Sequence, residues 1–275
     1  MALLETIQGP AEGFEGRVGV SVEYLGTGES ASLNGDELFP TASVFKVPVI
    51  VELYRQVETG TISLDEKIVL RDEDKVPGSG ILKELSEGLE LSVRDLTELM
   101  MILSDNTATD LVTEMVGLDN VNDALRRLGL EKTRVVADCR DILSDFSSGG
   151  SWSLGTEDNN VTTPNEMLRL FELIVDGEAA GRESCDAILR TMSRCQTGEY
   201  RLAKYLPRDK VYIAHKTGGL TGRGRSVRND VGVVTFRNSG ERYIISCFTN
   251  EALDAYRAEE FLATVSEKVY EYFTS

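Results

Sequence analysis

The stretch Thr41-Ala42-Ser43-Val44-Phe45-Lys46 leads into a long apolar segment that continues to about Glu58. Its length and composition predict a buried helix over about 44–58, and Pro48 is near enough to the start to be tolerated in the first turn. Residues three apart share one face of a helix, so we expect the hydroxyl of Ser43 beside the amine of Lys46. A hydroxyl next to a base is the usual arrangement of an activated serine nucleophile.

Two more short motifs follow in the chain, Ser104-Asp105-Asn106 and Lys216-Thr217-Gly218. Each motif alone is common, because S-D-N suits a helix end or turn and K-T-G suits a strand that ends in a turn. All three in this order favour a shared site. The catalytic group would then be Ser43, Lys46, Ser104 and Lys216.

The motifs supply side chains suited to each step of acyl transfer. Desolvation, or a second cation such as Lys216, would lower the pKa of Lys46 so that it can take the serine proton. Ser104 could relay a proton. The side chains of Asn106 and Thr217 could hold a substrate amide and carboxylate, and the backbone N–H groups of Ser43 and Gly219 could form an oxyanion hole.

The single histidine, His215, excludes several other mechanisms. Metal sites built on two or three imidazoles are impossible, and no G-x-S-x-G elbow exists for a Ser-His-Asp triad. Walker A and dinucleotide-binding fingerprints are also absent. We therefore expect a lysine base, no metal and no cofactor.

The composition is that of an ordinary globular protein with a strongly acidic surface. The 275 residues include 46 acidic and 29 basic side chains, a net charge of −17, which disfavours nucleic acid and anionic membranes as partners. The start of the chain lacks the features of an export signal, and no window is apolar enough for a membrane span. The expectation is a monomeric cytoplasmic protein acting on a small molecule, exported only if a leader was removed.

The order of predicted elements indicates an α+β fold. Strands are expected near both ends of the chain with helices between them, which favours one antiparallel sheet covered by helices. Periodicity disappears between 131 and 161, where a long structureless loop is expected. The predicted strands are about 18–24, 211–215, 230–236 and 242–249, and the predicted helices about 92–103, 107–116, 119–128, 164–175, 182–195 and 255–273.

The chain resembles class A serine β-lactamases and related penicillin-recognising serine hydrolases over nearly its whole length. The resemblance implies one domain over 1–275, with a five-stranded antiparallel sheet and flanking helices (about 1–45 and 200–275), an all-helical lobe (about 46–199) and the site between them. It also implies acylation of Ser43 by a β-lactam or a related acyl donor. The matching segments are 41–46, Ser104-Asp105-Asn106-Thr107-Ala108, Val161-Thr162-Thr163-Pro164, His215-Lys216-Thr217-Gly218 and Arg228-Asn229-Asp230-Val231-Gly232-Val233-Val234.

The resemblance also implies an arginine for the substrate carboxylate, about nine residues after the start of the third motif. Arg225 lies at that distance from Lys216, with Arg223 and Arg228 as neighbours. The three form a local positive patch in an acidic protein. A solvated loop would explain the patch equally well.

The match breaks where the family has the glutamate that activates the deacylating water. Counting along the loop places Cys139 there, and no glutamate occurs between Glu131 and Glu157. Asp138 or Asp141 could substitute, Lys46 or a different water could perform deacylation, or deacylation could be slow. An inert thiol is a better interpretation of Cys139 than a nucleophile, because the sequence offers it no clear cationic partner.

Three functions follow from these observations. The leading hypothesis is a β-lactamase-type serine hydrolase that acts through an acyl-enzyme on Ser43. The second is a cytoplasmic esterase, amidase or D-Ala peptidase with the same chemistry on an acyl-peptide or ester. The third is a penicillin-binding or sensor domain that deacylates slowly, which the missing glutamate motivates.

Overall fold

A computed structural model of the chain describes residues 2–148, 159–222 and 224–275. Its contacts group into two compact units. The sheet unit consists of Met1–Val44, Val161–Glu172 and Gly198–Ser275, and the helical unit of Phe45–Asn160 and Leu173–Thr197. Residues 161–172, which the sequence analysis assigns to the helical lobe, therefore group with the sheet.

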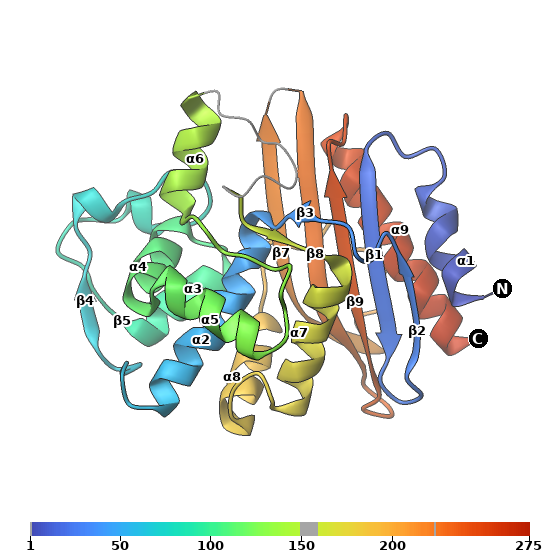
Figure 1. The fold of residues 1–275 in the computed structure, drawn as a ribbon, viewed down its shortest axis with the longest axis horizontal. Helices are drawn as coiled ribbons and strands as arrows, with labels where there is room; N and C mark the ends of the chain where they lie inside the picture. The colour runs from blue at the N-terminus through green and yellow to red at the C-terminus, as the bar shows by residue number, and fades with distance from the viewer. Residues whose placement is uncertain (1, 149–158, 223) are drawn as a thin grey trace. The chain divides into compact units, whose positions relative to one another are not determined.

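The sheet unit is built on five antiparallel strands in the order β2-β1-β9-β8-β7 (Figure 1). Strands from both ends of the chain meet where β1 pairs with β9, which confirms the expected topology. The motif strand is longer than predicted, because it continues through Lys216-Thr217-Gly218 to the hairpin with β8. The bounds are β1 Arg17–Tyr24, β2 Glu29–Leu33, β7 Val211–Gly222, β8 Arg225–Phe236 and β9 Arg242–Asn250.

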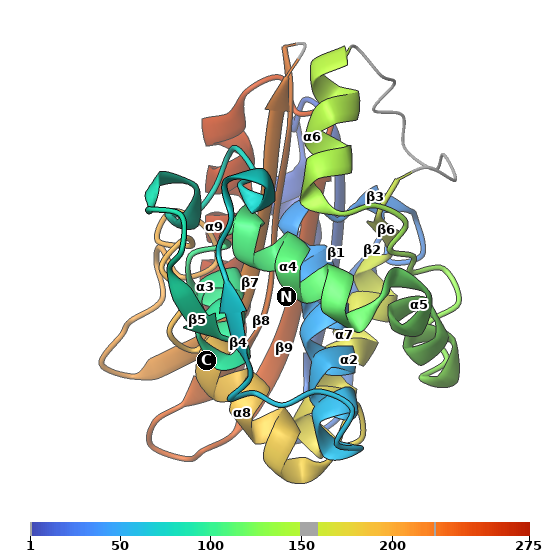
Figure 2. The same cartoon turned by 90° about the vertical axis from the view of Figure 1, so that its left-hand side faces the viewer.

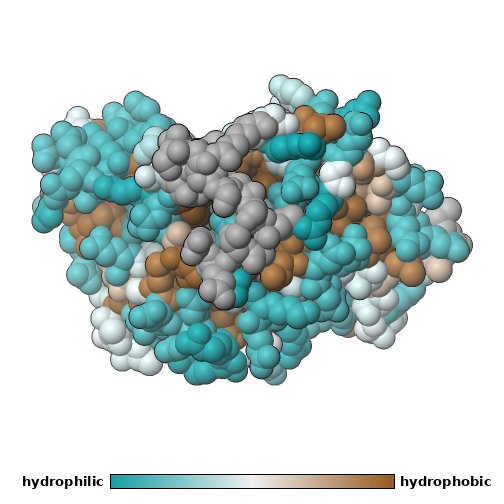
Figure 3. Space-filling model, turned by 45° about the horizontal axis from the view of Figure 1, so that its top comes forward, coloured by the Kyte–Doolittle hydropathy of each residue, from teal (hydrophilic) through white to brown (hydrophobic). Residues whose placement is uncertain are grey.

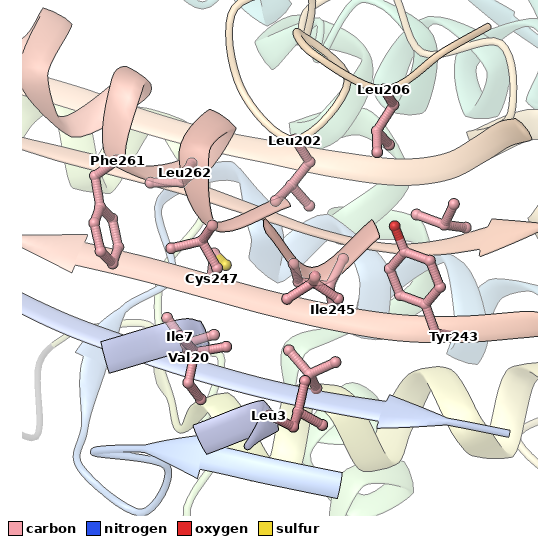
Figure 4. Packing of buried hydrophobic residues seen from close by; sticks show 14 of the residues in the cluster. Leu3, Ile7, Val20, Leu202, Leu206, Tyr243, Ile245, Cys247, Phe261 and Leu262 are labelled. Carbon is pink, nitrogen blue, oxygen red and sulfur yellow. The ribbon is translucent and has the colours of Figure 1, made fainter. Parts of the chain in front are cut away.

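Two helices from opposite ends of the chain, α1 (Leu3–Gln8) and α9 (Ala255–Thr274), lie together over one face of this sheet (Figure 1). The side chain of Asp254 caps the start of α9 by accepting hydrogen bonds from the backbone N–H groups of Tyr256 and Arg257. Apolar side chains from both helices meet those of β1 and β9 in one buried cluster (Figure 4). Burial of this cluster supports the sheet on which the third motif lies.

The helical unit is centred on α4 (Asn106–Val116), which α3 (Val93–Ile102), α5 (Leu118–Arg127) and α6 (Cys139–Ser148) surround (Figure 2). The helix α2 (Lys46–Glu58) packs against α4 and carries Lys46 at its first position. The hydroxyl of Ser92 caps the start of α3, because it accepts a hydrogen bond from Asp95 N. The remaining elements are η1 Gly9–Ala11, β3 Phe39–Pro40, η2 Ala42–Phe45, β4 Lys67–Val69, η3 Asp72–Asp74, η4 Leu82–Glu84, β5 Glu90–Ser92, β6 Val161–Thr162, α7 Pro164–Asp176 and α8 Arg182–Met192.

The helix α6 is an addition to the sequence-based expectation of a structureless stretch over 131–161. Periodicity missed it because the helix is begun by polar side chains rather than by an apolar pattern. Asp138 accepts a hydrogen bond from the backbone N–H of Asp141, one turn into the helix. Residues 149–158 of the predicted loop lie outside the described residues.

Hydrophilic residues cover most of the face seen in Figure 3, with apolar residues in separate patches. This agrees with the excess of acidic over basic side chains. Within the described part of the chain, no helix combines the length and apolar character required to span a membrane.

Candidate active site

The second motif forms a strained turn between α3 and α4. Ser104 adopts a left-handed backbone conformation with φ of 56°, which a residue other than glycine rarely adopts. The buried carboxylate of Asp105 stabilises the turn: one oxygen accepts from Ala108 N at 3.0 Å, and the other from Ile81 N at 2.6 Å and Leu82 N at 2.9 Å. The position of Ser104 is therefore determined by its neighbour.

The turn is packed against the segment Pro77-Gly78-Ser79-Gly80. A side chain at Gly80 would begin 2.2 Å from the Asp105 carboxyl group, and one at Gly78 would begin 2.8 Å from Asn106 Nδ2. Both glycines also have positive φ. Asn106 Nδ2 donates to Pro77 O at 2.9 Å, so this segment fixes the orientation of the Asn106 amide.

Lys46 is fully buried and points at the second motif. Its Nζ donates to Ser104 O at 2.8 Å, to Ser104 Oγ at 3.1 Å and to Asn106 Oδ1 at 3.1 Å. Burial lowers the pKa of this amine, and the negative charges of Cys139 in its thiolate form, Asp110 and Asp105 act in the opposite direction. The geometry thus joins three of the predicted residues, Lys46, Ser104 and Asn106, within the helical unit.

Ser43 lies in the short helix η2, which runs directly into α2. The preceding residue, Ala42, has a positive φ of 44°, and Val44 N donates to Thr41 O at 3.1 Å to close the turn. This tight turn presents Ser43 three residues before Lys46 along one continuous helical path.

Within the sheet unit, β7 approaches the backbone of the Ser43 turn at Gly218. A side chain at Gly218 would begin 2.5 Å from Thr41 O and 3.2 Å from Ser43 N. Only glycine allows the strand to come this near. The predicted oxyanion-hole residue Gly219 is the next residue of the strand.

Lys216 and Thr217 are both buried in β7, and Lys216 Nζ donates to Thr217 O at 2.8 Å. Alternation along the strand directs His215 to the face opposite Lys216. There, His215 Nδ1 lies 2.9 Å and 3.0 Å from the two carboxylate oxygens of buried Asp230. The only histidine is therefore engaged with a carboxylate on the other face of the sheet.

The predicted arginine, Arg225, begins β8 at the hairpin, pairs with Gly222, and is exposed with Nη1 3.2 Å from Glu251 O. Arg228 lies nearer the third motif, directly opposite Gly219, and its Nε contacts Glu259 Oε1 at 3.2 Å. Arg223 lies outside the described residues. The register thus places Arg228, rather than Arg225, beside the motif.

The two aspartates considered for deacylation lie at the start of α6. Asp138 is half-buried and caps the helix, and Asp141 is exposed. Cys139 between them is buried, and burial raises the pKa of its thiol to about 12. The thiol is therefore protonated at neutral pH and unsuited to act as a nucleophile or a base.

Asp110 is a residue of this region that the sequence analysis missed. Its two carboxylate oxygens accept from Cys139 N at 2.8 Å and Arg140 N at 3.0 Å, so α4 holds the start of α6. Burial raises the pKa of Asp110 to about 6. Its position one helical turn after Asn106 was a usable signal, because residues four apart lie on one face of a helix.

Among the described residues, no three His, Cys, Asp or Glu side chains gather as they would around a metal ion. The chemistry available from the geometry is that of a serine hydroxyl, a buried amine, a hydroxyl relay and an amide.

Known proteins are similar to the chain in both sequence and fold. A model of the β-lactamase enzyme family matches residues 2–273. The β-lactamase VEB-1 of Pseudomonas aeruginosa is 26% identical over 268 residues, which cover 94% of this chain and 85% of that protein.

Solved structures agree with the sequence comparison. The crystal structure of a β-lactamase from Sphaerobacter thermophilus is 33% identical, with a TM-score of 0.84 and coverage of 97% of this chain and 94% of that one. An ancestral class A β-lactamase is 27% identical, with a TM-score of 0.87 and coverage of 98% and 100%. The resemblance to class A enzymes is confirmed, and the chain belongs to the β-lactamase enzyme family.

Proposed function

We propose that this protein is a serine β-lactamase that opens β-lactams through an acyl-enzyme on Ser43. The observation that carries the proposal is the buried Lys46 amine, hydrogen-bonded to Ser104 and Asn106 and located three residues from Ser43. A buried amine with a lowered pKa is suited to take a proton from a hydroxyl. Membership of the family supports the same chemistry.

In the acylation step, Ser43 Oγ attacks the carbonyl carbon of the lactam and loses its proton to Lys46 Nζ. The carbonyl oxygen becomes an oxyanion that the backbone N–H groups of Ser43 and Gly219 stabilise. The carbonyl–nitrogen bond then breaks, and the leaving nitrogen receives a proton through Ser104. The product of this step is an ester of Ser43 with the ring opened.

The side chains around the nucleophile hold the substrate in our proposal. Asn106 binds the amide next to the lactam ring. The hydrogen bond to Pro77 O holds the Asn106 side chain in one orientation. Lys216 and Thr217 provide positive charge and a hydroxyl for the carboxylate of the substrate. Arg228 is the arginine that the strand register places beside this motif.

Deacylation requires a base that activates a water to attack the ester. The thiol of Cys139 is protonated, and both oxygens of Asp110 already accept backbone hydrogen bonds. We propose that Lys46 activates this water and that the step is slower than acylation. A general base contributes about 10²–10⁴ to a rate, which is the range available for such slowing.

The test is hydrolysis of nitrocefin by the wild-type chain and by Ser43→Ala. The proposal expects turnover that Ser43→Ala removes, together with a covalent adduct mapped to the peptide that contains Ser43. Absence of both hydrolysis and adduct in the wild type would reject it. Cleavage of p-nitrophenyl esters or D-Ala peptides without any reaction with penicillins would assign the same serine to a different substrate.

A further inference from the structure

Asn229 is a fully buried amide of β8 that joins three segments of the sheet unit. Its Nδ2 donates to Pro40 O at 2.8 Å and to Thr41 O at 3.0 Å. Its Oδ1 accepts from the backbone N–H of Thr249 on β9 at 3.2 Å. Both N–H groups of the amide are therefore used on the two consecutive carbonyls that precede the Ser43 turn.

These two carbonyls directly precede a residue with a strained backbone, Ala42. Thr41 O also accepts from Val44 N, so one oxygen joins the Asn229 amide to the closing bond of the turn. Ala42, which lies between Thr41 and Val44 in the chain, has a positive φ of 44°. A residue with a side chain keeps this conformation only when its surroundings enforce it.

The backbone of Asn229 is itself fixed from the opposite end. Arg201 Nη1 donates to Asn229 O at 3.0 Å and to Gly218 O at 2.9 Å, carbonyls of paired residues on β8 and β7. Arg201 Nη2 lies 3.4 Å from Glu259 Oε1 on α9. A run of hydrogen bonds and one ion pair thus extends from α9 through Arg201 and Asn229 to the Ser43 turn.

We propose that Asn229 is a positioning residue for acyl transfer: its amide sets the height of the Ser43 turn above β7, and with it the backbone N–H of Ser43. Asn229 does not touch the reacting atoms. It acts through Thr41 and through Gly218, where a Cβ would lie 3.2 Å from Ser43 N. The inference rests on the proposed function, because it concerns an oxyanion donor of that reaction.

The experiment is single-turnover acylation and deacylation by nitrocefin, followed by stopped flow and corrected for the fraction of folded enzyme. Asn229→Ala removes both donors, and we expect the two rate constants to fall together by about 10–100-fold, because the oxyanion forms in both steps. Asn229→Ser, which keeps a single hydroxyl donor, should lose less and provides a second variant if the alanine variant does not fold.

The matched control is Ser21→Ala, which removes the hydrogen bond from Oγ of the buried Ser21 on β1 to Asn165 Oδ1. It should lower the thermal stability without changing either rate constant per folded molecule. If folded Asn229 variants also keep wild-type rate constants, Asn229 is merely structural and the inference is overturned. A wild-type chain that forms no adduct on Ser43 would instead reject the proposed function itself.

Discussion

Lys46 and Cys139 lie in the same helical unit but differ in what surrounds them. The Lys46 amine donates to three oxygens of Ser104 and Asn106, which belong to a turn that Asp105 and two glycines hold in place. The Cys139 segment also has a carboxylate anchor, Asp110, but it presents a protonated thiol. The neighbours of Lys46 therefore hold a potential base in place for acylation, whereas the start of α6 is held in place but supplies no base.

The largest effect should follow from Lys46→Ala. If Lys46 is the proton acceptor, the acylation rate constant should fall by about 10²–10⁴. Lys46→Arg is the control, because a guanidinium keeps the charge but cannot be deprotonated. Stopped-flow acylation of both folded variants decides the matter: recovery of the rate by arginine would show that Lys46 serves only as a cation.

Removal of the Asp105 carboxylate should be the most damaging change to the stability of the Ser104 turn. Asp105→Ala leaves the N–H groups of Ile81, Leu82 and Ala108 without their acceptor, for which we expect a loss of about 3–5 kcal/mol in the free energy of unfolding. Asp95→Ala removes an exposed capping box at α3 and should cost about 1 kcal/mol. Equal losses in urea unfolding would contradict the support that we assign to Asp105.

The two regions also differed in how far the sequence predicted them. The order of the motifs predicted that Lys46 and the second motif share a site, and the structure contains hydrogen bonds from Lys46 Nζ to Ser104 and Asn106. Asp110 was missed, because its partners lie about 30 residues away in a segment without apolar periodicity. Spacing from Lys216 led to Arg225, whereas the pairing of β7 with β8 places Arg228 opposite Gly219, which spacing along the chain does not reveal.

For the fold also, local sequence patterns predicted more than the pairing of distant segments. Alternating apolar residues and turn signals predicted the sheet strands from both ends of the chain and the long helix at its end. Periodicity did not predict that β7 continues through the third motif, because the glycines there carry no apolar pattern. It also could not show that Asn229 joins β8 to Thr41, a contact between residues far apart in sequence.

Asp110 should make the stability of the helical unit depend on pH. Its pKa is raised from 3.8 to about 6 in the folded chain, so the unfolded chain releases this proton first as the pH rises. Between about pH 4 and pH 6 the wild type should therefore lose up to about 3 kcal/mol relative to Asp110→Asn. Urea unfolding across this range checks the difference, and Asp141→Asn, which keeps Asp110, should lose stability as the wild type does.

Cys139→Glu should have the smallest effect of these changes. It tests whether the start of α6 lacks only a base. A carboxylate in place of the protonated thiol supplies a base at the start of α6, and we expect deacylation to accelerate about tenfold or more. Cys139→Gln has nearly the same size without the charge and should leave the rate unchanged. An equal change in both variants, measured by loss of the acyl-enzyme, would mean that size rather than basicity is responsible.

A time course of the wild-type acyl-enzyme shows whether formation or hydrolysis of the Ser43 ester is the slower step. Mixing with excess penicillin, quenching at intervals and measuring the intact mass gives both rate constants in one experiment. We predict that most of the enzyme carries one penicillin on Ser43 during turnover, because deacylation is the slower step. Turnover without accumulation of that adduct would show that deacylation is not the slower step.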